Sequence, residues 1–299
     1  MALGGATLDR ARCPSTVLLM SEGWYRLANT LGRFALTSLA IDVRVTGAEH
    51  LPTVGPALLA ATHSSFADFL FVEKAAITRG RYVRFLCRHD MWHQPLLAGP
   101  MDRMQHIPVD REAPAGAYLR ARRLLRDGEA VGTFPEAGIS YSYTVRSLMR
   151  GTAALARETQ VPIIPVALWG GQRIYSVRRP DAVGKRPVPD LTRGRRVDVS
   201  FGEPIAIGSG VDLNEATRAL GVRLTELLEE LQGRPYHRPR PGEWAPWHPA
   251  HLGGAAPSRH EARGLDSVPR SAVLPAWGPE LCGPPDTGPC DATPTCRAD

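Results

Sequence analysis

The residues of this chain whose types and spacing suit chemistry are a histidine and an aspartate, His63 and Asp68, which directly follow the apolar run 57–62. If a helix begins near Ser64, the carboxylate reaches one imidazole nitrogen, fixes the tautomer and leaves the other nitrogen to accept a proton. Such a base suits an alcohol that attacks an activated acyl group, with no serine nucleophile. The alternative is structural: His63 caps the helix and Asp68 is a solvated acid in its first turn.

Three further blocks, each containing proline, follow in the chain. They are GPMDRMQHIPVDR at 99–111, FPEAGIS at 134–140 and VPIIPVAL at 161–168. Together with 63–68, and in this order, they resemble the four motif blocks of the 1-acyl-glycerol-3-phosphate acyltransferase family. The resemblance covers roughly residues 40–205 and is greatest to the bacterial lysophosphatidic acid acyltransferases, in particular to a subgroup with F-P-E-A-x-I-S as third block.

The resemblance implies a role for each matching residue. His63 is the general base and Asp68 orients it. Arg111 holds the phosphate of the acceptor, and Glu136 also binds the acceptor. The other positions expected to bind substrate are Gly138 and Ser140 in the third block and Pro165, in a strand that shapes the acyl pocket.

The third block departs from the common family pattern F-P-E-G-T-R-S, because Ile139 stands at the arginine position. A buried phosphate needs cationic or N–H partners, since an uncompensated anion is costly to desolvate. We expect Arg103, Arg146 or Arg150 to supply the missing charge. The substitution leaves the acceptor open between 1-acyl-glycerol-3-phosphate and another lysophospholipid, glycerol 3-phosphate or a glycolipid.

The reaction implied by the resemblance moves a fatty acyl group from acyl-CoA or acyl carrier protein to a free hydroxyl, giving phosphatidic acid. Backbone N–H groups after His63, or a nearby arginine, are expected to stabilise the oxyanion. No metal or redox cofactor is expected: His89, His93 and His106 lack metal-ligand spacing, and no G-x-S-x-G elbow indicates a serine hydrolase.

The elements that position these residues are predicted from short apolar runs, which are typical of buried strands. The runs are 41–46, 57–62, 83–87, 130–134, 163–168 and 197–201. Helical patterns cover 115–127 and 212–232, the second beginning with the capping box Asp212-x-x-Glu215. Alternating strands and helices predict an α/β fold. The resemblance implies a mixed, mostly parallel central sheet flanked by helices, as in glycerol-3-phosphate acyltransferases.

Composition divides the chain into three parts. Residues 1–40 form an N-terminal amphipathic helical segment, which packs on the core or lies in a membrane interface. Residues 41–233 form the acyltransferase domain. Residues 234–299 carry 13 of the 27 prolines and show no sustained periodicity, so we expect a largely disordered tail. Within it, two tryptophans are expected to anchor residues 244–256 on the domain.

The charge and cysteine content indicate partners and location. A net charge of +6 suits an anionic membrane surface, and arginine content alone, without a nucleic-acid fold signature, does not favour a non-catalytic nucleic-acid-binding protein. Five scattered cysteines fit a reducing cytosol. Neither a signal peptide nor a run of about 18–20 apolar residues is evident. We expect a cytoplasmic protein, peripheral on the inner face of the cell membrane.

Overall fold

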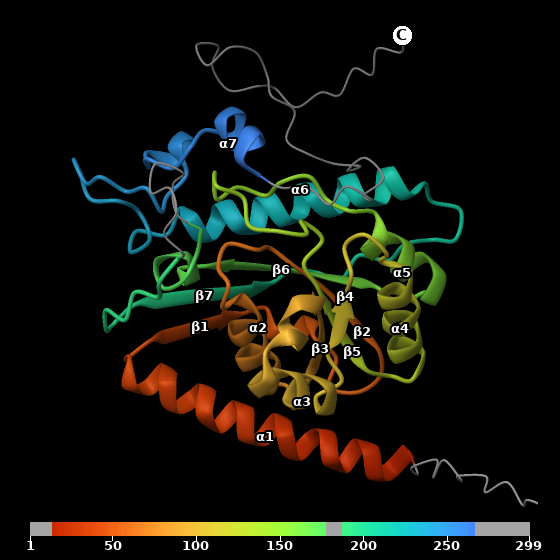
Figure 1. The fold of residues 1–299 in the computed structure, drawn as a ribbon. Coiled ribbons are helices and arrows are strands. Elements are labelled where there is room, and N and C mark those ends of the chain that lie inside the picture. Colours follow the sequence, from red (N-terminus) through yellow and green to blue (C-terminus); the bar gives the residue numbers. More distant parts are fainter. Residues whose placement is uncertain (1–13, 178–186, 267–299) are drawn as a thin grey trace, which may run out of the picture.

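The computed structural model describes residues 14–177 and 187–266, with side chains from residue 23 onward. Its centre is a seven-stranded sheet (Figure 1). The strands are β1 (Asp42–Thr46), β2 (Ala57–Ala61), β3 (Val83–Arg88), β4 (Ile107–Val109), β5 (Ala130–Thr133), β6 (Ile163–Trp169) and β7 (Arg196–Phe201). Their order is β1-β7-β6-β2-β5-β3-β4, and every neighbouring pair is parallel except β6–β7. The predicted mixed, mostly parallel sheet is confirmed.

Six of these strands lie where the apolar runs predicted them. The exception is β4, which pairs with β3 through Leu86 and Ile107 and was not predicted. It has only three residues, and Pro108 in its middle removes a backbone donor, so no strand pattern marks it.

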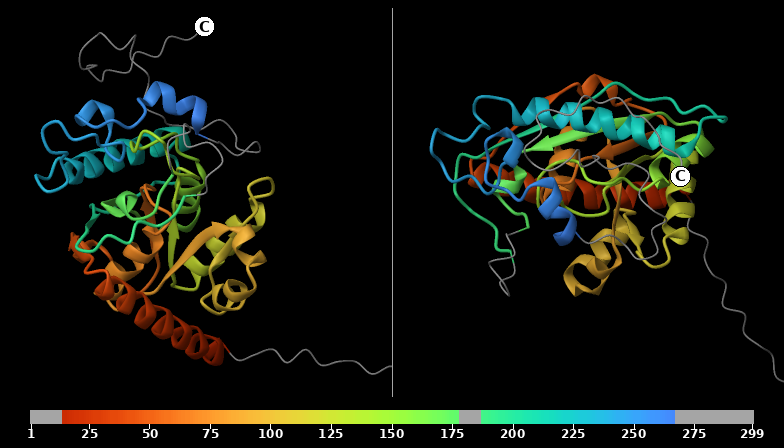
Figure 2. Two further views of the ribbon diagram at one scale, coloured as in Figure 1. Left: turned by 60° about the vertical axis from the view of Figure 1, so that its left-hand side comes forward. Right: turned by 90° about the horizontal axis from the view of Figure 1, so that it is seen from above.

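Helices cover both faces of the sheet. Alternate residues of β2 enter two cores: Leu58 and Ala60 face one, and Ala57, Leu59 and Ala61 the other. The first core includes α4 (Ala115–Arg126), α5 (Gly151–Thr159) and α6 (Leu213–Gln232), and the second includes α2 (Asp68–Ile77). The two sides are separated in Figure 2. As predicted, Asp212 caps α6, its side chain accepting from the N–H groups of Asn214 and Glu215.

The N-terminal helix α1 (Pro14–Ser38) lies along one side of the body, opposite α6 (Figure 1). It is attached through Tyr25, which is 2% exposed, stacks on Tyr82 at 4.6 Å and lies against the Arg84 guanidinium. An apolar row of Leu27, Leu31 and Phe34 stays 50–73% exposed. No helix in the described ranges is long and apolar enough to cross a bilayer.

Residues 234–266 are ordered on the body, so the expectation of a largely disordered tail is wrong for this stretch. It contains the helix α7 (Arg259–Leu265), and single anchors hold it in place. His237 Nε2 lies 2.6 Å from the buried Asp198 carboxylate, Ala245 and His248 are buried, and Trp247 carries the Arg173 guanidinium on its ring. Isolated anchors leave no periodic sequence signal. Residues 267–299 lie outside the described ranges.

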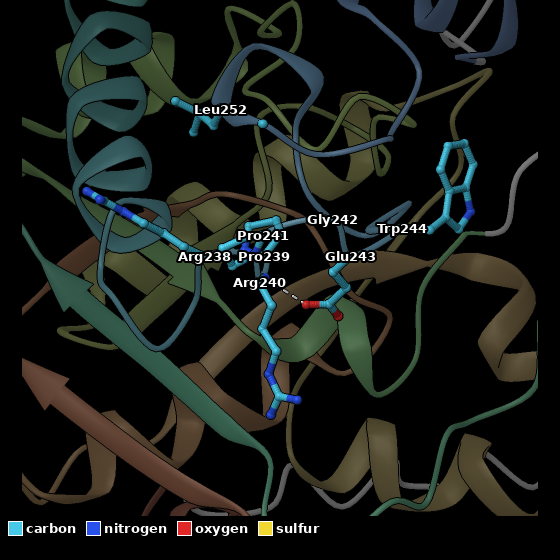
Figure 3. A pocket seen from close by; sticks show the side chains of 9 residues that line it. Arg238, Pro239, Arg240, Pro241, Gly242, Glu243, Trp244 and Leu252 are labelled. Carbon is cyan, nitrogen blue, oxygen red and sulfur yellow. Dashed lines mark hydrogen bonds between the residues drawn. The ribbon is translucent and has the colours of Figure 1, made fainter.

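A surface hollow of about 510 Å³ lies within this C-terminal segment (Figure 3). Residues 238–244, Leu252 and Gly253 line it, and the N–H of Arg240 donates to the Glu243 carboxylate. None of the residues expected to bind substrate lines this hollow, and the proposed chemistry belongs to another part of the molecule.

Candidate active site

The candidate active site lies at the carboxyl edge of the parallel strands. His63 comes two residues after the end of β2, Glu136 three after β5 and Arg111 two after β4. Parallel strands of one sheet end at the same edge, where α/β proteins bind their ligands. The strand order places β5 next to β2, and so brings the first and third motif blocks together although they lie about 70 residues apart.

His63 and Asp68 form a hydrogen-bonded pair. The distance from His63 Nδ1 to Asp68 Oδ2 is 3.1 Å, and the same oxygen accepts the N–H groups of Ser64 and Ser65 at 2.7 Å each. A carboxylate oxygen accepts, so Nδ1 carries the proton and the lone pair of Nε2 is available to a substrate. The His63 side chain is 20% exposed and that of Asp68 only 1%. The interpretation of Asp68 as a solvated acid is therefore wrong.

The helix after His63 begins later than expected. Asp68 is the first residue of α2, whereas the prediction had the helix start near Ser64. Residues 64–67 form a turn around the Asp68 carboxylate, which uses the N–H groups of Ser64 and Ser65. Because these N–H groups are occupied, they are not available to stabilise an oxyanion. This differs from the role that the sequence analysis expected for them.

The Asp68 carboxylate lies in a dry, closely packed environment. Burial raises its pKa, while His63 and the N–H groups of Ser65 and Ser64 oppose the rise. The second oxygen, Oδ1, is buried and has no hydrogen-bond partner among the described residues. It lies beside Gly171, where a Cβ would come within 3.2 Å of Oδ1 and 3.0 Å of the Ser65 Cβ. Gly171 is a site residue that we did not predict; its signal is the Gly-Gly pair at 170–171, shortly after the predicted strand 163–168.

The His63 ring is held by aromatic contacts as well as by Asp68. It stacks on Phe134 of the third block, with 4.4 Å between ring centroids, and Phe134 in turn stacks on Phe85 at 6.0 Å. Stacking on one side and a hydrogen bond at Nδ1 together fix the direction of Nε2.

Glu136 bridges the first and third blocks. It is 1% exposed, and its two oxygens accept the backbone N–H groups of His63 at 2.8 Å and Arg146 at 2.9 Å. Burial raises the pKa of Glu136 to about 8, although these N–H groups and the Arg146 charge oppose the rise. The carboxylate faces the protein and holds the backbone of His63. This differs from the expectation that Glu136 contacts the acceptor.

Two arginines meet over Gly138. A Cβ placed on Gly138 would lie 3.1 Å from Arg146 Nη1 and 3.9 Å from Arg111 Nη2, and Arg111 also donates to the carbonyl of Ala137 at 2.6 Å. Burial, together with the charges of Arg88 and Arg146, lowers the pKa of Arg111. Ile139 turns into the core and is 7% exposed. Of the three arginines expected to replace the motif arginine, Arg146 is the one that the fold brings to Arg111.

The other expected substrate residues lie elsewhere. The Arg103 guanidinium lies over the Trp24 ring of α1 at 4.8 Å. Arg150 contacts Asn214, at the start of α6, at 3.4 Å. Pro165 is buried inside the sheet, where it pairs with Ala60 and lies next to Gly202. The geometry does not bring these three together with His63.

Ser140 is buried and bonds to the C-terminal segment. Its hydroxyl donates to Asp266 Oδ2 at 2.8 Å and lies 2.9 Å from the hydroxyl of Ser142. The N–H of Tyr141 donates to Asp266 Oδ1 at 3.0 Å. Asp266 was not predicted, because it lies 126 residues after Ser140 in a proline-rich region. Within the described ranges, no group of three or more His, Cys, Asp or Glu side chains is placed to hold a metal ion.

Comparisons with known proteins show which proteins the chain resembles. A family model described as Acyltransferase matches residues 42–169, from β1 to the end of β6. A 1-acyl-sn-glycerol-3-phosphate acyltransferase of Bacillus subtilis is 26% identical over 203 residues, which cover 66% of this chain and 93% of that protein. The mouse 1-acyl-sn-glycerol-3-phosphate acyltransferase alpha is 30% identical over 139 residues, and the match spans about half of it (48%).

A solved structure has the same fold. The crystal structure of the 1-acyl-sn-glycerophosphate (LPA) acyltransferase PlsC from Thermotoga maritima superposes with a TM-score of 0.57 and 22% identity. The superposition covers 74% of this chain and 88% of that one. The matched range 42–169 contains all four motif blocks. Over residues 42–169 the chain is similar to the acyltransferase family, and the relatives named above are 1-acyl-sn-glycerol-3-phosphate acyltransferases.

Proposed function

We propose that this protein transfers a fatty acyl group to the free hydroxyl of 1-acyl-glycerol-3-phosphate and forms phosphatidic acid. The observation that carries the proposal is the pairing of a base with an anion site. The base is His63 with Asp68, and the anion site is the pair Arg111 and Arg146. The Glu136 carboxylate links the two, because it accepts the backbone N–H groups of both His63 and Arg146. The relatives named above are acyltransferases of this substrate class, which supports the same acceptor here.

The chemistry follows from the tautomer of His63. Nε2 takes the proton of the acceptor hydroxyl as its oxygen attacks the thioester carbonyl of the acyl donor. The tetrahedral intermediate collapses, the C–S bond breaks, and the thiol leaves with the proton that His63 returns. Asp68 accepts from Nδ1 throughout, so it stabilises the imidazolium that forms. The donor is acyl-CoA or acyl carrier protein.

The phosphate of the acceptor is assigned to the space at Gly138, between Arg111 and Arg146. Guanidinium groups bind phosphate with parallel N–H donors, and partial burial strengthens the contact. A second candidate function keeps the chemistry and changes the acceptor to another lysophospholipid, glycerol 3-phosphate or a glycolipid. Ile139 favours it, because the usual motif arginine is absent.

We also propose that α1 places the protein on the inner, cytoplasmic face of a membrane. Its exposed row Leu27, Leu31 and Phe34 is accompanied by the exposed residues Arg26 and Arg33. Apolar burial combined with attraction to anionic lipid is the binding mode of interfacial helices. Flotation with anionic liposomes tests this: the double variant Leu31→Ser, Phe34→Ser should lose membrane binding and keep its fold. Equal flotation of the variant and the wild type would refute the proposal that α1 binds the membrane.

An acceptor panel tests the reaction. Purified protein is incubated with labelled acyl-CoA, or with labelled acyl carrier protein, and with 1-acyl-glycerol-3-phosphate, glycerol 3-phosphate, a lysophospholipid without a terminal phosphate, or a glycolipid. Phosphatidic acid as the main product supports the proposal. Transfer only to acceptors without a phosphomonoester would refute the assignment of the arginine pair and favour the second function.

A further inference from the structure

The C-terminal segment contributes a carboxylate to the motif region. Asp266, directly after α7, accepts from the Ser140 hydroxyl at 2.8 Å and from the N–H of Tyr141 at 3.0 Å. Its Oδ2 also lies 4.0 Å from Arg146 Nε, and both side chains are nearly buried, 11% exposed for Asp266 and 6% for Arg146. A residue from outside the matched range 42–169 therefore contacts Ser140 of the third block and two residues that follow it, Tyr141 and Arg146.

The Arg146 guanidinium has Asp266 on one edge and Gly138 near another. Nε, on one edge, faces the Asp266 carboxylate. Nη1, on another, lies at the space over Gly138 that it shares with Arg111. Two guanidinium groups side by side repel each other: burial lowers the pKa of Arg111 most, and the charges of Arg88 and Arg146 lower it further. A carboxylate on the far edge offsets this repulsion and limits the rotation of the buried side chain.

We propose that Asp266 is a positioning residue for acceptor binding: it holds Arg146 beside Arg111, so that the pair replaces the motif arginine whose place Ile139 takes. The acceptor site is thereby completed by the C-terminal segment. This inference rests on the proposed function, because it assigns the phosphate to the arginine pair.

The contacts favour positioning over competition with the phosphate. Both carboxylate oxygens of Asp266 are already used, Oδ2 by Ser140 and Oδ1 by Tyr141, so the group is fixed to the loop. It approaches Arg146 from the Nε edge, whereas Nη1 is the Arg146 atom nearest to Gly138. A competing carboxylate would instead lie between the two guanidinium groups.

The test compares Asp266→Asn with a matched carboxylate in the same segment. Asparagine can still bond to Ser140 and Tyr141, but it removes the charge beside Arg146. We expect the KM for the acceptor to rise about fivefold, as for weakening one charge-assisted contact. We expect kcat to stay within about twofold and the KM for the acyl donor to be unchanged. Glu243→Gln, whose exposed side chain contacts the N–H of Arg240, should match the wild type.

A double variant shows whether Asp266 acts through Arg146. In an Arg146→Lys background, Asp266→Asn should add less than about a twofold increase in KM, because the group it positions is already gone. Full additivity of the two changes would overturn the proposal. So would a lower acceptor KM in Asp266→Asn, which would mean competition, or an unchanged one.

A binding measurement separates failure of this inference from failure of the proposed function. Titration calorimetry with glycerol 3-phosphate is carried out on the wild type and on Asp266→Asn, without any acyl donor. A roughly fivefold weaker Kd in the variant supports the role of Asp266 even if 1-acyl-glycerol-3-phosphate is not acylated. An equal Kd in both proteins overturns the inference even if the enzyme is active.

Discussion

Replacing Glu136 by glutamine tests whether this side chain holds the His63 backbone or binds the acceptor. Both carboxylate oxygens accept buried backbone N–H groups, from His63 and from Arg146. Glutamine has one acceptor oxygen, so its NH₂ must face one of these two donors. A buried donor left without a partner costs about 1–3 kcal/mol. We therefore expect the free energy of unfolding of Glu136→Gln at pH 6 to be about 1–3 kcal/mol lower than that of the wild type.

The difference should depend on pH, because burial raises the pKa of Glu136 to about 8 from an ordinary value of 4.5. The folded state therefore holds the proton more tightly than the unfolded state. This stabilisation is fully present below about pH 4.5 and is lost as the pH rises through about 8. From pH 6 to pH 8, the wild type should lose about 2 kcal/mol from this group. Glutamine does not titrate, so the gap between the two proteins should narrow by that amount.

Urea unfolding at pH 6 and pH 8, with steady-state kinetics at pH 7, measures both effects. We expect a lower kcat for Glu136→Gln, because the His63 backbone shifts, with a smaller change in the KM for the acceptor. A higher acceptor KM with unchanged kcat and unchanged stability would refute this reasoning. That result would restore the interpretation of Glu136 as an acceptor ligand.

Two further changes test the arginine pair. Gly138→Ala should raise the acceptor KM about tenfold, since the new methyl group lies 3.1 Å from Arg146 Nη1. The control Gly151→Ala, with open space around the new methyl group, should leave the kinetics unchanged. Equal KM values in the two variants would contradict the assignment of the phosphate to the arginine pair. Arg111→Met should raise the acceptor KM by about 10–100-fold while Arg150→Met changes it less than about twofold, measured with 1-acyl-glycerol-3-phosphate as the varied substrate. A larger rise in acceptor KM for Arg150→Met than for Arg111→Met would instead assign the phosphate to the region where Arg150 contacts the start of α6.

Much of the fold was predictable because buried parallel strands are nearly continuous apolar runs. In β2 and β6 every residue is buried, and both were located within one residue. The strand β4, three residues long with a central proline, carries no such pattern. The order of strands was not predictable from the local sequence, and it decides which motif blocks meet.

The site was predictable where it depends on short spacing. His63 and Asp68 are five residues apart, and their contact needs only one turn of chain. The inward direction of Glu136 depends on the pairing of β5 with β2. Which arginine lies beside Arg111 depends on how the loop after the third block returns to Gly138, and this loop brings Arg146 there. Such contacts are properties of the tertiary structure.

The C-terminal segment shows the same limit. Its proline content predicts disorder, yet residues 234–266 are held by a few separate contacts, such as that of His237 with Asp198. The contribution of Asp266 to the third block has no counterpart in composition or periodicity. The boundaries at residues 40 and 233 remain predictions.

The central claim is that His63 is the base that activates the acceptor hydroxyl. The most direct measurement is the rate of phosphatidic acid formation by His63→Ala, beside His260→Ala, which removes an exposed histidine of α7. Loss of a general base costs about 10²–10⁴-fold. We expect a fall of this size in kcat for His63→Ala, with the unfolding transition preserved and His260→Ala fully active. Equal rates for wild type and His63→Ala would contradict it.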